Sequence, residues 1–162
     1  MNFIQKLTGQ KQFVIDGVNG SETYTSVKGK IGEGAFAYVN RVKNTAGNDY
    51  AVKRIVCTTE EHTQEAYQEI ELLKQLQSHP NIMPYLGCGK RTNKRSQQEV
   101  LLLMPFYSNG TILSICDSGR GYPFSAFSDI EVIGKMLTHI IEGLHHMHFA
   151  KGLRHNDLKV SS

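Results

Sequence analysis

Two glycines and a lysine have the types and the spacing for binding a phosphate chain. Gly32 and Gly34 stand one residue apart, and small and β-forming residues follow them. Glycine lets the main chain approach an anion and present N–H groups to it. Lys53 lies between apolar residues, where a charged amine needs an anionic partner. The glycines alone favour a tight turn between two strands, so the phosphate hypothesis depends on the surrounding elements.

A helix predicted to begin at Thr58 supplies a carboxylate for Lys53. Thr58 and Glu61 have the spacing of a capping box, and the helical pattern runs to about residue 77. At 100° per residue Glu69 falls within the apolar stripe of this helix. A carboxylate on a buried face is costly unless a cation meets it. We therefore predict an ion pair between Lys53 and Glu69; the alternative is a Glu69 that reaches water at the edge of the stripe.

Antiparallel strands are predicted on both sides of the glycines. They cover residues 27–31, 36–42 and 50–57, and two more at 83–88 and 100–104 complete a five-stranded sheet. A dinucleotide-binding fingerprint requires a helix directly after the glycines, whereas a strand is predicted here. No Gly-Lys-Ser/Thr follows either, which excludes a Walker P-loop. Residues 1–22 are expected to form a loose lead-in, within which residues 13–15 have the character of a short strand.

The second half of the sequence predicts a hinge and then helices. Residues 104–111 pass from an apolar strand end through proline into a polar link, and a short helix is predicted near 112–116. A long helix is predicted to begin at Ser128, which has the spacing of a capping box with Glu131. Its apolar stripe is about 140° wide. Near the end of this helix, His145, His146 and His148 fit ordinary surface or core positions better than a metal site, because only His145 and His148 share a face.

Composition sets broad limits on function. The chain has 162 residues, 40% of them hydrophobic, with a net charge of +3. These values are typical of one globular domain without a dedicated nucleic-acid surface. The basic residues 90–95 leave three alternatives open: a solvated hairpin tip, an acidic-substrate site or a nucleic-acid site. Three widely spaced cysteines and the lack of a signal, myristoylation or membrane-spanning pattern predict a reducing, cytoplasmic location.

Taken together, five motifs resemble the opening part of a eukaryotic protein kinase, in the same order. They are Gly32-x-Gly34-x-x-Ala37-x-Val39, Ala51-Val52-Lys53, Glu69, His79-Pro80-Asn81-Ile82 and His155-Asn156-Asp157-Leu158-Lys159. Residues 32–39, residues 50–55 and the Leu-Met-Pro-Phe-Tyr link resemble the Numb-associated serine/threonine kinases. The resemblance implies an α+β fold, a kinase N-lobe with a five-stranded antiparallel sheet and one helix, followed by the first helices of the C-lobe. The implied divisions are lead-in 1–22, N-lobe 23–104, hinge 105–110 and partial C-lobe 111–162.

The resemblance also implies a role for individual residues in transferring a phosphoryl group from ATP to a protein serine or threonine. Backbone groups near the glycines would cover the phosphates, and Lys53, held by Glu69, would bind them. Asp157 would accept the substrate hydroxyl proton, and Lys159 would neutralise charge on the transferred group. The implied ATP contacts are Ile31, Gly32, Glu33, Gly34, Ala35, Phe36, Ala37, Val39, Ala51, Lys53, Glu69, Met104 as gatekeeper, Pro105 and Tyr107.

Several positions depart from the kinase pattern. Ala37 replaces the third glycine, Asn156 stands where the family has arginine, and Ser162 falls at the asparagine position that binds Mg²⁺. No Asp-Phe-Gly occurs within residues 1–162, so we expect this polypeptide alone to be an incomplete, inactive kinase portion. The alternative is a non-catalytic nucleotide-binding or interaction module, with a protein partner on the exposed helix 128–149. No nucleic-acid partner and no membrane anchor are expected.

Overall fold

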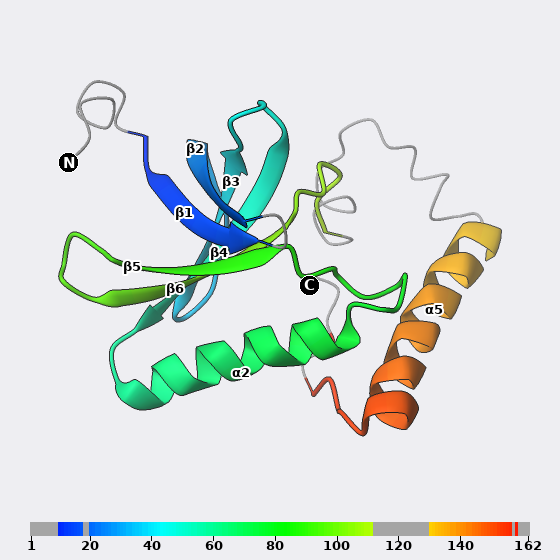
Figure 1. The fold of residues 1–162 in the computed structure, drawn as a ribbon. Coiled ribbons are helices and arrows are strands. Elements are labelled where there is room, and N and C mark those ends of the chain that lie inside the picture. The colour runs from blue at the N-terminus through cyan, green and yellow to red at the C-terminus, as the bar shows by residue number, and fades with distance from the viewer. Residues whose placement is uncertain (1–9, 18–19, 112–129, 157, 159–162) are drawn as a thin grey trace. The chain divides into compact units, whose positions relative to one another are not determined.

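The computed structural model describes residues 10–17, 20–111, 130–156 and 158, apart from the side chain of Lys28 (Figure 1). The chain forms two compact units. The first comprises Met1–Gln77 and Met83–Phe106, and the second comprises Ser78–Ile82 and Tyr107–Ser162. Each unit is described by itself below.

The first unit is built on a closed barrel of six antiparallel strands. Their order around the barrel is β1-β2-β3-β4-β6-β5. The predicted sheet had five strands, and the sixth is β1, which pairs with both β2 and β5 and so closes the barrel. The strands are β1 Gln12–Gly17, β2 Gly20–Glu33, β3 Ala37–Lys43, β4 Asp49–Cys57, β5 Gly87–Thr92 and β6 Gln98–Pro105.

Some predicted strand limits need correction. The strand predicted over residues 27–31 begins at Gly20, within the segment expected to be a loose lead-in. The strand predicted over residues 83–88 begins only at Gly87, since residues 83–86 lie outside any strand. Phe13 and Ile15 on β1 are each only 1% exposed, because alternate residues of this strand point into the barrel. The short strand suspected at residues 13–15 is therefore part of the main core.

Two clusters of buried residues lie on opposite faces of the strands. The cluster inside the barrel consists of Phe13, Ile15, Tyr24, Val42, Val52, Leu101 and Leu103. The cluster on the outer face consists of Cys57, Ala66, Ile70, Val100 and Leu102. Alternation along β6 sends Leu101 and Leu103 inward and Val100 and Leu102 outward. Both faces of β6 are buried, which explains its continuous apolar run.

Helix α2, Glu60–Leu76, covers the outer face of β4 and β6 (Figure 1). Its N-cap is Thr59, whose hydroxyl oxygen accepts a hydrogen bond from the backbone N–H of His62 at 3.2 Å. The N-cap predicted at Thr58, with its capping box to Glu61, is therefore wrong by one residue. The hydroxyl of Thr58 instead lies 3.0 Å from Nδ1 of His62. The buried residues Ala66, Ile70 and Leu76 confirm most of the predicted apolar stripe.

The second unit contains helix α5, Ile130–His145, which continues as a π-helical turn, η1 His146–Ala150. Gly143 packs against the segment after α2, since a Cβ on it would lie 3.1 Å from the carbonyl oxygen of Asn81. The side-chain amide of Asn81 donates a hydrogen bond to Glu142 at 2.7 Å. The predicted helix start at Ser128 and the predicted helix 112–116 lie outside the described residues.

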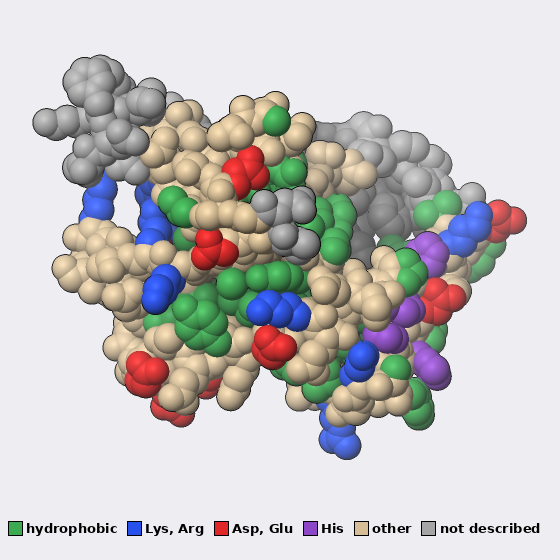
Figure 2. Space-filling view, viewed as in Figure 1, with side chains coloured by type: hydrophobic (Ala, Val, Ile, Leu, Met, Phe, Trp, Pro, Cys, Tyr) green, Lys and Arg blue, Asp and Glu red, His purple; other side chains and the backbone are tan. Residues whose placement is uncertain are grey.

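Much of the apolar stripe of α5 is exposed within its unit. Ile130 is 79% exposed and Ile141 is 63% exposed, and Phe149 in η1 is 78% exposed. Figure 2 shows hydrophobic side chains at the surface of this helix beside its histidines. The described helices include none that is both long and apolar enough to cross a bilayer.

Candidate functional site

The glycine hairpin joins β2 to β3 and is fixed by backbone hydrogen bonds. Gly34 N–H donates to the carbonyl oxygen of Ala37 at 2.8 Å, which closes the turn. The carbonyl oxygen of Phe36 at the tip accepts a hydrogen bond from Val56 N–H at 2.9 Å. The Phe36 ring lies 5.4 Å from the ring of His62 in the first turn of α2. The tip of the hairpin is thus held against β4 and α2.

Lys53 and Glu69 form the ion pair that the sequence predicted. Lys53 Nζ lies 2.5 Å from Glu69 Oε1, and the pair joins β4 to α2. Val39 is the residue opposite Lys53 in the β3–β4 ladder, so the lysine starts directly beside the strand that leaves the glycine hairpin. The side chain of Lys53 is 29% exposed and that of Glu69 is 42% exposed. The ammonium group is oriented by its partner and remains reachable from solvent.

An apolar platform lies next to this pair on the same face of the sheet. Ala51 is two residues before Lys53, is 4% exposed and is paired with Met104 on β6. Pro105 is the last residue of β6 and lies opposite Tyr50. At the end of a strand, the missing N–H of proline removes no hydrogen bond from the strand interior. The first unit therefore contains most of the residues expected to contact a nucleotide. These are Ile31, Gly32, Glu33, Gly34, Ala35, Phe36, Ala37, Val39, Ala51, Lys53, Glu69, Met104 and Pro105.

The remaining expected site residues lie in the second unit or outside the described residues. Tyr107 belongs to the second unit, where it is 61% exposed. Asp157, Lys159 and Ser162 lie outside the described residues. Asn156 has a φ of 49°, a left-handed conformation that asparagine adopts more readily than most residues. The backbone conformation gives a reason for asparagine at this position, where the kinase pattern has arginine.

The donor set of the first unit suits a polyphosphate better than a metal ion. Lys53 supplies a fixed cation, and the strand that leaves the glycine hairpin pairs with β4 beside it. Among the described residues, no three His, Cys, Asp or Glu side chains are grouped closely enough to hold a metal.

His146 stacks on His79 with ring centroids 4.9 Å apart, and burial, followed by the charge of His79, lowers the pKa of His146.

A buried charge network within the barrel was missed from the sequence. Arg54 Nη2 donates to Glu99 Oε1 at 2.6 Å, and Arg91 Nε donates to Glu99 Oε2 at 2.7 Å. Asn40 accepts a further bond from Arg54 at 3.2 Å. Burial opposes ionisation of Glu99, but hydrogen bonds from the two arginines outweigh it and lower its pKa to about 2. Strand alternation carried the signal, since Glu99 shares the inward face of β6 with Leu101.

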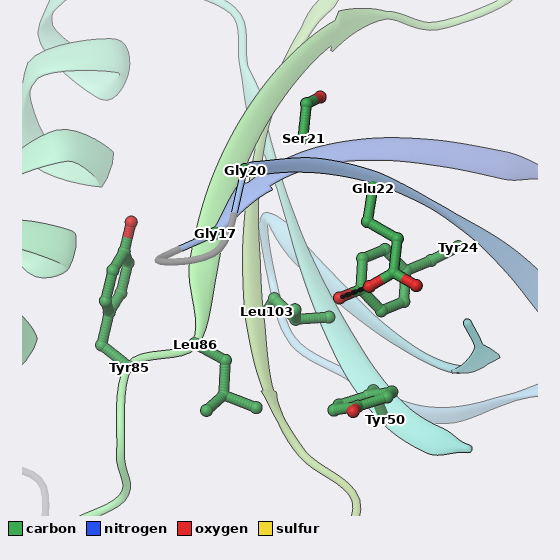
Figure 3. A pocket seen from close by; sticks show the side chains of 9 residues that line it. All are labelled: Gly17, Gly20, Ser21, Glu22, Tyr24, Tyr50, Tyr85, Leu86 and Leu103. Carbon is green, nitrogen blue, oxygen red and sulfur yellow. Dashed lines mark hydrogen bonds between the residues drawn. The ribbon is translucent and has the colours of Figure 1, made fainter. Parts of the chain in front are cut away.

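The two open ends of the barrel differ in chemistry. The end near the start of β4 is a cavity of about 460 Å³ in which Tyr24 and Tyr50 meet edge to face, with ring centroids 5.4 Å apart (Figure 3). The Tyr24 hydroxyl donates to Glu22 at 2.9 Å, and burial followed by this hydrogen bond raises the pKa of Tyr24. Among the described residues that line this end, there is no Lys or Arg. The opposite end, near Glu99, is strongly basic.

Comparison with known proteins gives the family. The family model of the protein kinase domain matches residues 25–161. Serine/threonine-protein kinase 16 of Mus musculus is 34% identical over 134 residues, which cover 82% of this chain and 42% of that protein. The Homo sapiens protein of the same name is 35% identical, with the same coverage. A probable serine/threonine-protein kinase of Dictyostelium discoideum is 29% identical over 96% of this chain and 19% of its own length.

These relatives are longer than the matched segment, and the chain spans less than half of their length. The family match itself covers most of the chain and includes the glycine hairpin, Lys53 and Glu69. The chain therefore belongs to the protein kinase domain family.

Proposed function

We propose that the chain is the ATP-binding portion of a protein serine/threonine kinase domain. The observation that carries this proposal is the 2.5 Å ion pair between Lys53 and Glu69 beside the glycine hairpin. A lysine fixed in this way is prepared to meet the charge of the α and β phosphates. Backbone N–H groups of residues 33–37 then cover the phosphates, and Val39 and Ala51 pack on the adenine ring.

The proposed hinge and catalytic residues extend this site. Met104 acts as gatekeeper, while the carbonyl of Pro105 and the N–H of Tyr107 bind the adenine edge. Asp157 accepts the proton of a protein serine or threonine hydroxyl, and Lys159 neutralises the transferred phosphoryl group. Ser162 stands at the position of an Mg²⁺ ligand, where a neutral hydroxyl binds the ion weakly. The motifs of residues 32–39 and 50–55 support a finer assignment to the Numb-associated branch. We further propose that the protein acts in the cytoplasm.

Nucleotide binding is the first test of this proposal. We expect ATP with Mg²⁺ to raise the melting temperature of the 162-residue chain, and Lys53→Met to abolish the shift. The matched control is Lys74→Met, because Lys74 pairs with Glu71 on the exposed side of α2. An equal shift in wild type and Lys53→Met would contradict the assignment of Lys53.

Catalysis is tested separately from binding. A polypeptide of residues 1–162 contains no Asp-Phe-Gly, so it lacks the aspartate that holds Mg²⁺ on the phosphates. We expect no phosphorylation of a generic protein substrate by this polypeptide. Phosphorylation that depends on ATP and disappears in Asp157→Ala would overturn that expectation.

A second candidate function is a non-catalytic module that binds nucleotide and a partner protein. The exposed apolar side chains of α5 favour it, since such a surface commonly marks an interaction site. This proposal predicts a protein partner on helix 128–149. The two candidates are distinguished with a chain that also includes the Asp-Phe-Gly segment. Phosphoryl transfer by that chain supports the kinase, and its absence supports the non-catalytic module.

A further inference from the structure

The basic residues of the β5–β6 hairpin are part of a larger cavity at one end of the barrel. The cavity has a volume of about 740 Å³ and lies at the end of the barrel where β4 finishes. Figure 2 shows Lys and Arg side chains flanking a hollow above the tip of the β5–β6 hairpin. The basic side chains that line the cavity are Lys11, Lys30, Arg54, Arg91, Lys94 and Arg95.

Positive charge is in excess in this cavity. Six basic side chains line it against one carboxylate, Glu99. Glu33 neutralises Lys30 across 3.1 Å, which still leaves a formal charge of +4, whereas the whole chain carries +3. Lys11, Lys94 and Arg95 form no salt bridge with any carboxylate that the structure describes. The cavity thus lacks the anions that would balance its cations.

Two arginines of the cavity, Arg54 and Arg91, are held in place, unlike ordinary surface cations. Arg54 and Arg91 share the Glu99 carboxylate, and the Arg91 guanidinium also lies 4.7 Å from the centre of the Phe13 ring. Fixed side chains lose little entropy when a ligand binds. Burial, followed by repulsion from Arg54 and Arg91, lowers the pKa of Lys11, and attraction to Glu99 offsets this only in part.

The shape and the uncharged lining limit the class of ligand. The volume lies within the range of cavities that hold a ligand of drug size. Phe36, Tyr38 and Val56 supply an apolar wall, and Gln97 supplies a side-chain amide that can bind a peptide group. Clustered Arg and Lys side chains are the usual receptors for phosphorylated side chains.

We propose that this cavity binds a peptide segment carrying phosphoserine or phosphothreonine. The phosphate lies between Lys11 and the Lys94-Arg95 turn, with Arg91 at the base of the cavity, and the flanking peptide packs on Phe36 and Val56. This site uses the inward face of β4, whereas Lys53 projects from the outward face. The two sites thus use opposite faces of β4 and share only the hairpin tip at Ala35 and Phe36.

The test measures binding of a degenerate peptide library with a fixed central phosphoserine by fluorescence anisotropy. The unphosphorylated library is the ligand control. We expect the phosphorylated library to bind at least tenfold more tightly. The Lys94→Glu/Arg95→Glu double variant should lose at least tenfold in affinity, since both side chains are exposed and their replacement leaves the core intact. Lys11→Gln is a second variant, with an expected loss of about threefold to tenfold.

The matched control is Lys135→Glu/Lys151→Glu, which changes the net charge equally at exposed positions of the second unit. Binding by this control within twofold of wild type supports the proposal. An equal loss in both double variants, or no preference for the phosphorylated library, would overturn it. Tighter binding to phosphatidylserine vesicles or single-stranded RNA than to the phosphorylated library would also overturn it.

Discussion

Gly89 on β5 lies directly against the carbonyl oxygen of Val14 on β1, and no space remains there for a Cβ atom. Gly87, two residues earlier, is also close to β1, since a Cβ on it would lie 2.8 Å from the carbonyl oxygen of Asp16. These two glycines let β1 cross β5 closely enough to close the barrel. Barrel closure buries Phe13 and Ile15 and positions β1 beside the basic cavity.

Replacing Gly89 with alanine should open this side of the barrel. The added methyl group forces β1 and β5 apart, and overpacking of this kind costs about 1 to 3 kcal/mol. We expect faster hydrogen exchange of the β1 amides together with a lower urea midpoint. Gly134→Ala is the control, because Gly134 lies within α5 with nothing near its missing Cβ. That variant should gain up to about 1 kcal/mol; unchanged β1 exchange in Gly89→Ala would contradict the steric argument.

Replacing Glu69 with glutamine should separate binding from stability. Both members of the Lys53–Glu69 pair are partly exposed, and such pairs add only about 0 to 1 kcal/mol to folding. The hydrogen bond from Lys53 to Glu69 also holds the lysine in position for the nucleotide. Losing a hydrogen bond to a charged group costs about 1.5 to 3 kcal/mol. We therefore expect about tenfold to 100-fold weaker ATP binding with a melting temperature within about 2 °C of wild type.

Glu71→Gln is the matched control for that measurement. Glu71 lies on the same helix and pairs with Lys74, and its side chain is 61% exposed. Its replacement should leave both nucleotide binding and stability unchanged. If Glu69→Gln and Glu71→Gln bind ATP equally, Glu69 does not orient Lys53 for the nucleotide.

Local patterns predicted the outward face of the barrel well and its inward face poorly. Helical periodicity was sufficient to place Glu69 toward the sheet, and the Lys53–Glu69 pair is present. The role of β1 was not predictable in the same way, because it depends on pairing with β5, more than 70 residues later in the chain. Glu99 was passed over for the same reason. Its partners Arg54 and Arg91 become neighbours only when three strands are aligned.

The Thr58 error has a local cause. Thr58 and Thr59 are both suitable N-cap residues, and sequence spacing favoured Thr58 because Glu61 completes a capping box. In the structure Thr59 has the extended conformation of an N-cap, with φ −133° and ψ 165°. β4 ends at Cys57, so both threonines lie in the short link between this strand and α2. Sequence patterns define such boundaries only to within a residue or two.

Acid should destabilise the barrel through Glu99. Its pKa is about 2 in the folded state and near 4.5 when the carboxyl group is free. A depressed folded-state pKa stabilises the fold above the unfolded pKa, and this contribution is lost as pH falls from about 4.5 toward 2. We expect the urea midpoint to drop over this window. Glu99→Gln should cost about 3 to 5 kcal/mol at pH 7, since it leaves Arg54 buried without its anion, and its stability should change less on acidification. Equal acid dependence in both proteins would contradict this assignment.

The apolar side chains of α5 should govern self-association of the 162-residue chain. Ile130 and Ile141 are 79% and 63% exposed, and burying each against a partner stabilises the contact by about 1.5 to 3 kcal/mol. We expect the Ile130→Gln/Ile141→Gln variant to remain monomeric in sedimentation velocity at concentrations where wild type associates. Its melting temperature should stay within about 2 °C of wild type, because neither side chain is part of a core. His139→Gln, an exposed polar change on the same helix, should behave as wild type. A loss of several degrees in the double variant would show that these isoleucines are packed within the fold and do not form a free surface.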